Sequence, residues 1–263
     1  KHLKFFESSI DLLSYAALNR EKLQDAWLVS MDGLKHHVIS HYVEESISEL
    51  SRKQTFPQSI EVCVDNDRAG HIFYEKEQLK GIVDPFTNKK IRCERGIPND
   101  WQVPKEYKAT YEAVAKEMNV EPEAIMAIHK TETNLQLTNQ LVSAYDVQST
   151  FGKMLAKGEP VETIDLKEAC TTVAKELKVC ERADGTYNFD RFYSRKANIK
   201  DVKAGILLSY KAEQYYKGYK KHEHEFVPEV KKDWNDQLKH EIQQQEIRKQ
   251  KRAMLFQQGI QHE

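Results

Sequence analysis

The strongest constraint on the fold is a threefold alternation of short apolar runs and helical patterns in the first eighty residues. The runs LKFFES, AWLVSM and SIEVCV are each followed by a stretch in which apolar residues recur every three or four positions. Short apolar runs are typical of buried strands, and the longer spacing indicates amphipathic helices. Strand–helix units in succession predict an α/β fold, with a parallel sheet flanked by helices.

The rest of the chain is predicted to be mostly helical. Residues 83–103 contain prolines and polar clusters, which indicate an irregular boundary. Amphipathic helical patterns then continue for more than a hundred residues, until the short extended pair Phe226-Val227. We therefore expect four parts, which are a core formed by the first three strands and helices, a large all-α insertion, a return to the core, and a polar helical tail. Their predicted bounds are 1–100, 104–221, 222–240 and 241–263.

Composition excludes some classes of protein. Hydrophobic residues make up 40% and charged residues 31% of the 263 residues, and the net charge is −1. Such a chain has no overall basic field, so nucleic-acid binding would need a local patch. No apolar run approaches membrane-spanning length and none resembles a signal peptide, which predicts a cytoplasmic protein without a membrane partner. Because the chain begins with Lys1 rather than Met, we expect it to be a piece of a longer protein.

Several patterns are better explained by packing or solvation than by a special site. The four cysteines form no CxxC pair and are expected to be reduced packing residues. His37 and His41 have the spacing of a zinc pair but lie in no HExxH motif. Residues 114–133 have the rhythm of a helix-turn-helix, yet the second helix is acidic, which favours a plain helical hairpin. The tyrosines and lysines of 209–222 are expected to pack and to face solvent, respectively. The basic run RKQKR in the tail either contacts phosphates or a partner protein or, by default, is a solvated charge run.

Carboxylates follow two of the three predicted strands. Glu7 follows the first, Gly33 the second, and Asp65 and Asp67 the third. Taken alone, the two aspartates are typical of a turn or a helix cap. In a parallel sheet, however, all these positions gather at the edge where ligands bind. Like charges at one edge repel unless a cation lies among them, and hard oxygen ligands suit Mg²⁺ or Mn²⁺.

The same segments resemble a known family. FFESSIDLLSYAAL, LVSMDGLKHHVI and VCVDNDRAG are similar to the Toprim domain of bacterial-type primases, type IA and type II topoisomerases and some nucleases. The family pattern is a Glu, then a Gly, then Asp-x-Asp-x-x-Gly, and its places are filled by Glu7, Gly33, Asp65, Asp67 and Gly70. The likeness is greatest to Toprim-like domains of plasmid and conjugative-element proteins of Gram-positive bacteria. KKDWNDQLK resembles the segment that follows the last strand of primase Toprim domains. In this chain, that strand and the segment after it would come more than a hundred residues after the third helix.

The resemblance implies roles for these residues. Asp65 and Asp67 would hold Mg²⁺ with Glu7, and Glu7 would be the general acid or base in phosphoryl transfer. Asp233 and Asp236 are either outer or second-metal ligands, or a helix cap and a first-turn acid.

Glycines and cations at the same edge complete the predicted site. Gly33 and Gly70 would leave room for a phosphate at helix starts. Lys35 and Arg68 either contact the nucleic-acid backbone or are solvated surface charges.

The first functional hypothesis is a Mg²⁺-dependent, primase-like enzyme of a mobile-element protein, acting on nucleic acid, with DNA favoured over RNA. Other plasmid transfer or replication proteins would be its protein partners. The second hypothesis is a catalytically silent module that binds nucleic acid or protein, since these residues show no strand-passage tyrosine, helicase part or zinc-binding part. A Toprim nuclease is the third.

Overall fold

The computed structural model describes residues 1–52, 57–83, 88, 90–97, 101–145, 147, 149–196, 202–221, 224, 226–227 and 229–260. The chain divides into two compact units. We call residues 1–66, 77–98 and 231–263 the sheet unit, and residues 67–76 and 99–230 the helical unit. The predicted domain bounds differ from these contact units in detail and stay predictions.

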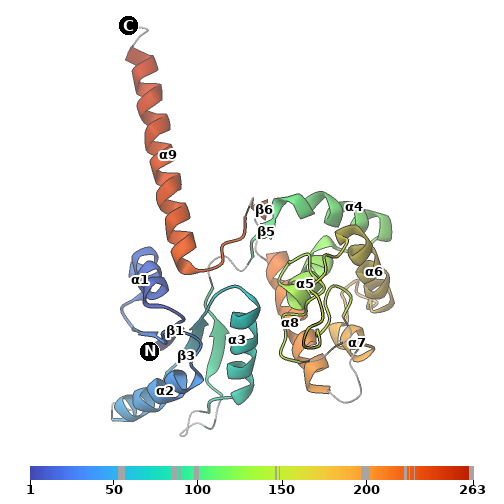
Figure 1. Ribbon diagram of the computed structural model, residues 1–263, viewed down its shortest axis with the longest axis horizontal. Coiled ribbons are helices and arrows are strands. Elements are labelled where there is room, and N and C mark those ends of the chain that lie inside the picture. The colour runs from blue at the N-terminus through green and yellow to red at the C-terminus, as the bar shows by residue number, and fades with distance from the viewer. Residues whose placement is uncertain are drawn as a thin grey trace. The chain divides into compact units, whose positions relative to one another are not determined.

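The sheet unit contains a four-stranded parallel sheet. Its strands are β1 (His2–Phe6), β2 (Ala26–Ser30), β3 (Ser59–Cys63) and β4 (Arg92–Arg95), in the order β2-β1-β3-β4. Figure 1 shows β1 and β3 side by side. Phe6 is paired with Ser30 on one side and with Cys63 on the other, so these three strands end at the same level. The predicted α/β fold is confirmed.

Helices complete the sheet unit. They are α1 (Ser9–Leu18), the short 3₁₀ helix η1 (Arg20–Lys22), α2 (His36–Ser51) and the C-terminal α9 (Trp234–Ile260). The hydroxyl of Ser8 accepts a hydrogen bond from the backbone N–H of Asp11, so Ser8 is the N-cap of α1. The start of α9 packs on α1, where Trp234 joins the buried side chains Phe6 and Tyr15.

The fourth strand was not predicted. Residues 83–103 were expected to be irregular, but β4 lies within them and pairs in parallel with β3. The expectation that more than a hundred residues separate the third helix, α3 (Arg68–Lys80), from the last strand of the sheet is therefore wrong. The strand was missed because its sequence, RCER, contains three charges and no apolar run. Charged side chains are common on edge strands, which must not pair with other chains. Residues 84–87, 89 and 98–100 lie outside the described part of the stretch.

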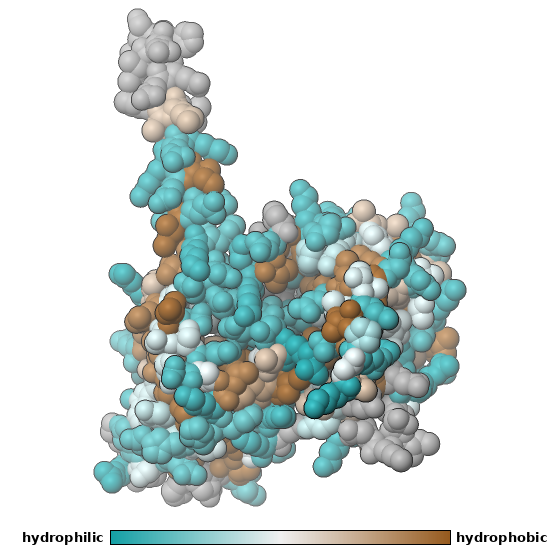
Figure 2. Space-filling view, viewed as in Figure 1, coloured by the Kyte–Doolittle hydropathy of each residue, from teal (hydrophilic) through white to brown (hydrophobic). Residues whose placement is uncertain are grey.

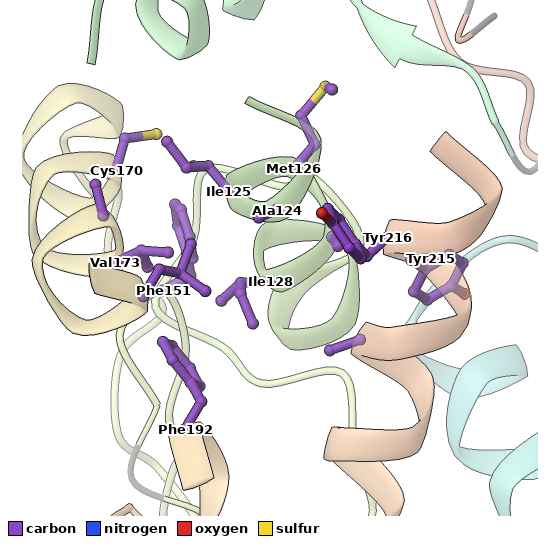
Figure 3. Close-up of a cluster of buried hydrophobic side chains, with 14 of the residues drawn as sticks. Ala124, Ile125, Met126, Ile128, Phe151, Cys170, Val173, Phe192, Tyr215 and Tyr216 are labelled. Carbon is purple, nitrogen blue, oxygen red and sulfur yellow. The ribbon is translucent and has the colours of Figure 1, made fainter. Parts of the chain in front are cut away.

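The helical unit is built around one buried helix. Its elements after β5 (Val103–Pro104) are η2 (Lys105–Tyr107), α4 (Lys108–Met118), α5 (Pro122–Thr133), α6 (Leu166–Val179), α7 (Phe189–Ser194), α8 (Val202–Lys221) and β6 (Phe226–Val227). Every residue of α5 from Ala124 to Thr133 is buried. Figure 3 shows side chains of α5 among those of α6, α7 and α8. The strand β6 pairs with β5, and not with the four-stranded sheet.

The burial of side chains indicates packing, and not nucleic-acid binding, for two sequence patterns of this unit. The helix-turn-helix rhythm corresponds to α4 and α5, and a fully buried α5 has no face to place in a major groove. On α8, Tyr215, Tyr216 and Tyr219 are buried in the core, whereas Tyr210 is half exposed. Packing therefore accounts for most of the aromatic residues that alternate with lysines. Among the described helices, none has both the length and the apolar content needed to cross a bilayer.

Candidate functional site

Strand order places the candidate site at a reversal of the chain's path. From β1 the chain runs to β2 on one side and then to β3 on the other side of β1. The connections that follow β1 and β3 therefore diverge, and ligands of α/β sheets bind at the carboxyl ends of strands where such a reversal occurs. Glu7 is the residue after β1, and Asp65 is two residues after β3.

Three of the predicted residues meet at this edge. The backbone N–H of Asp65 donates to Oε2 of Glu7 at 3.3 Å. The backbone N–H of Gly33 donates to the carbonyl of Glu7 at 2.7 Å. Gly33 has a φ of +104°, a conformation that favours glycine. The geometry thus joins residues that follow β1, β2 and β3.

Two cations that were not predicted lie on Asp65. Nζ of Lys232 is 2.6 Å from Oδ2 of Asp65, and Nη2 of Arg95 donates to the Asp65 carbonyl at 2.7 Å. The backbone N–H of Asn66 donates to the carbonyl of Lys232 at 2.7 Å, which ties the segment before α9 to the sheet edge. Lys232 directly precedes the predicted Asp233, so its place could have been inferred, whereas Arg95 lies on the strand that was missed.

Asp11 is a further carboxylate that was not singled out. Burial raises the pKa of Asp11, the Ser8 hydroxyl opposes that shift, and the nearby charges of Asp233 and Asp65 raise the pKa further. Asp11 also accepts a hydrogen bond from the backbone N–H of Asn235 at 3.2 Å. The signal in the sequence was its place, four residues after Glu7, in the segment FFESSIDLLSYAAL that carries the family resemblance.

Asp233 and Asp236 belong to the start of α9. Oδ1 of Asp233 accepts from the backbone N–H of Asp236 at 2.8 Å, so Asp233 is the N-cap and Asp236 lies in the first turn. Nζ of Lys239 is 3.4 Å from Oδ1 of Asp236. The cap and first-turn alternative therefore describes the geometry of both, and a part in metal binding stays a prediction.

The remaining predicted residues have structural contacts of their own. Within the helical unit, Oδ1 of Asp67 accepts from the backbone N–H of Gly70 at 2.9 Å and so caps the start of α3. Nε of Arg68 donates to the carbonyl of Leu141 at 3.1 Å, which holds its guanidinium to the backbone. Nζ of Lys35, at the N-cap position of α2, is 3.5 Å from Oδ2 of Asp32.

Comparison with known proteins identifies the fold that carries these carboxylates. Residues 5–101 match the Toprim-like family. This region is a Toprim-like domain. The match begins near the end of β1, includes β2, β3 and β4, and ends well before Lys232. The elements α4 to α8 lie beyond it and take no function from it.

One relative extends the comparison beyond the family. The chain is 46% identical over 76 residues to an uncharacterized protein of Bacillus anthracis from the plasmid pXO2. That stretch covers 29% of this chain and only 21% of the relative, so the chain spans about a fifth of the relative's length. No solved structure matches the chain significantly. The recognition of a plasmid-type Toprim-like domain is confirmed, and the relative assigns no activity to it.

The carboxylate oxygens at this edge of the Toprim-like domain are the type of ligand that a hard cation binds. Among the described residues, no group of three or more His, Cys, Asp or Glu side chains is arranged to hold a metal ion. Mg²⁺, however, commonly takes one or two carboxylates and keeps its other ligands as water and substrate phosphate. Glu7 and Asp65 carry two carboxylates at this edge, where the Asp65 backbone N–H donates to Glu7. Oδ2 of Asp65 is in contact with the ammonium of Lys232.

The other metal-like patterns have ordinary explanations. All four cysteines are free. Burial raises the pKa of Cys93 and of Cys170 to about 12, so both thiols stay protonated near neutral pH. In α2, Nε2 of His41 is 3.8 Å from Oε2 of Glu45, and His36 contacts Glu77, as expected of surface and partly packed histidines.

Proposed function

We propose that the Toprim-like domain carries out Mg²⁺- or Mn²⁺-dependent phosphodiester chemistry on nucleic acid, most simply primase-like nucleotidyl transfer. The observation that supports this proposal is the contact between Glu7 and Asp65 at the reversal between β1 and β3. We favour DNA over RNA as the substrate. We also propose a cytoplasmic setting with other plasmid transfer or replication proteins as partners, for which the plasmid source of the relative is the only support.

Each carboxylate would have its own part in the reaction. Asp65 with Glu7, and Asp67 as a further ligand, would hold the cation, which when bound offsets the negative charge of a phosphate. Glu7 would take or give the proton of the attacking or leaving oxygen, since a carboxylate within hydrogen-bond reach can act as general acid or base. Asp233 and Asp236 would act as outer or second-metal ligands.

The residues that follow β2 and begin α3 would recognise the substrate. The backbone at Gly33 would face a phosphate, and Gly70 would leave the start of α3 open to one. Lys35 and Arg68 would contact the nucleic-acid backbone, Arg68 after exchange of its present partner, the carbonyl of Leu141.

A catalytically silent binding module is the second candidate. The observation that favours it is the Lys232–Asp65 ion pair, because an ammonium 2.6 Å from the carboxylate can neutralise Asp65 without a metal ion. In that case the sheet edge would hold nucleic acid or a protein partner and would not need Glu7 as an acid or base.

Primer synthesis on single-stranded DNA separates the two candidates. Wild-type protein, Asp65→Ala and Glu7→Gln are compared with the exposed controls Asp25→Ala and Glu21→Gln in the same unit. The enzyme hypothesis predicts metal-dependent synthesis by the wild type and both controls, and loss of synthesis in the two site variants. DNA binding that is equal and metal-independent in all five proteins, without synthesis, supports the module. Incubation of the same proteins with plasmid DNA and Mn²⁺ tests the nuclease alternative.

A further inference from the structure

The outer part of α9 is a long exposed segment of the sheet unit. The first turn of α9 lies at the candidate site, where Asp233 caps the helix and Lys232 contacts Asp65. Residues 241–254, further along the same helix, are all exposed. Figure 2 shows this part of α9 as a projecting helix with a mostly hydrophilic surface. A helix of this kind has little packing to stabilise it, so its side chains are available for a partner.

Four cations are concentrated on this segment. They are Arg248, Lys249, Lys251 and Arg252. None of them has a side-chain ion pair or hydrogen bond within the part of the chain that the structure describes. An α-helix turns by about 100° per residue, which places all four on an arc of about 160°. They form one basic face, which we call the α9 basic face.

The four neighbouring cations lower the stability of the helix unless an anion binds to them. Like charges three and four residues apart, such as Arg248 and Arg252, destabilise a helix. The opposite side of the segment mixes Gln243 and Gln250 with Ile247 and Met254. It lacks the continuous apolar face that a coiled coil or a membrane-surface helix needs. A polyanion with regularly spaced charges is the partner that fits.

We infer that the α9 basic face binds the phosphate backbone of the nucleic acid that reaches the Toprim-like domain. The inference rests on the proposed function only for the identity of the partner. With a rise of 1.5 Å per residue, Arg248 and Arg252 lie about 21 and about 27 Å along the helix from Trp234. At 3.4 Å per base pair, this distance corresponds to about six to eight base pairs of duplex. A strand of that length extends from the sheet edge to the α9 basic face.

The test is the salt dependence of DNA binding by the full chain, measured by fluorescence anisotropy in EDTA. The variant replaces all four cations of the α9 basic face by Gln, a good helix former. Each phosphate contact contributes about 0.9 to the slope of log K against log salt concentration for duplex DNA. Loss of four contacts therefore lowers the slope by about 3.6, and affinity falls most at low salt.

A matched control keeps the same change in net charge. It replaces Lys116, Lys157, Lys167 and Lys175 by Gln, four exposed lysines of the helical unit. The inference requires that the control keep the wild-type slope, and that circular dichroism show equal helix content in all three proteins. An unchanged slope in the α9 variant, or an equal decrease in the control, overturns it. Binding to phosphatidylserine vesicles that depends on the four cations while DNA binding does not also overturns it.

The outcome is independent of catalysis. Because EDTA removes divalent cations, the slope is measured under conditions in which metal-dependent synthesis does not take place. Suppose that the wild type is catalytically silent and that the slope of log K against log salt concentration is smaller in the α9 variant. That result supports the inference and contradicts only the enzyme hypothesis.

Discussion

Asp65 and Lys232 form an ion pair at the edge of the sheet. The Asp65 carboxylate is mostly buried, with 17% of the side chain exposed, whereas half of the Lys232 side chain is exposed. The flexible partner can therefore leave while the carboxylate stays in place. The meeting of Glu7, Gly33 and Asp65 could be predicted because strand ends gather in a parallel sheet. The contact of Arg95 could not, because Arg95 lies on an unpredicted strand.

Replacement of Lys232 by Gln should strengthen Mn²⁺ binding. A half-exposed ion pair is worth up to about 1 kcal/mol, so removal of the competing ammonium should raise the affinity by up to about fivefold. Isothermal titration calorimetry with Mn²⁺ measures this change, with the exposed Lys22→Gln as the matched control. A weaker or unchanged affinity in Lys232→Gln would show that the ammonium does not compete with the ion.

At the scale of elements, prediction succeeded where apolar periodicity was strong. The first three strands and helices follow from it, because buried strands and amphipathic helices leave different spacings in the sequence. β4 leaves no such spacing, since an edge strand can carry charges on both faces. The starts of helices are a separate case. At Asp67 and at Asp233 the sequence does not distinguish a metal ligand from a helix cap. The structure shows both residues as caps.

Substitution of Asp67 separates the cap of α3 from a metal ligand. Asn caps a helix about as well as Asp, whereas Ala does not and costs about 1 kcal/mol. Asp67→Asn should therefore keep the wild-type stability, and Asp67→Ala should lose about 1 kcal/mol in urea denaturation followed by circular dichroism. If Asp67 is also a ligand, both variants lose Mn²⁺ affinity. Equal Mn²⁺ affinity in Asp67→Asn and wild type would restrict Asp67 to the cap.

At the scale of the whole molecule, neither of the two compact units is one continuous stretch of the sequence. Residues 67–76 belong to the helical unit although they lie between two segments of the sheet unit. A buried ion pair explains this. Oε1 of Glu75 on α3 is 2.7 Å from Nζ of Lys211 on α8, and Oε2 accepts from Ser143 and from the backbone N–H of Ala144. Such a pair links residues far apart in sequence, which periodicity cannot reveal.

Removal of one member of that pair should be costly. Lys211→Met leaves the fully buried carboxylate of Glu75 without its cation and should lower the free energy of unfolding by about 3–5 kcal/mol. The double substitution with Glu75→Gln should recover most of this loss, because it removes the buried charge. Urea denaturation followed by circular dichroism checks both. A Lys211→Met variant as stable as wild type would contradict the structural role given to the pair.

We propose that the sheet edge of the Toprim-like domain is a divalent-cation site built from Glu7 and Asp65. The most direct measurement is the anomalous scattering of crystals soaked in Mn²⁺, for the wild type and for Asp65→Ala. We expect an ion at the carboxylates of Glu7 and Asp65 in the wild type, with the ammonium of Lys232 displaced, and no ion there in Asp65→Ala. A wild-type edge that stays without an ion at every Mn²⁺ concentration, with Lys232 still on Asp65, would contradict it.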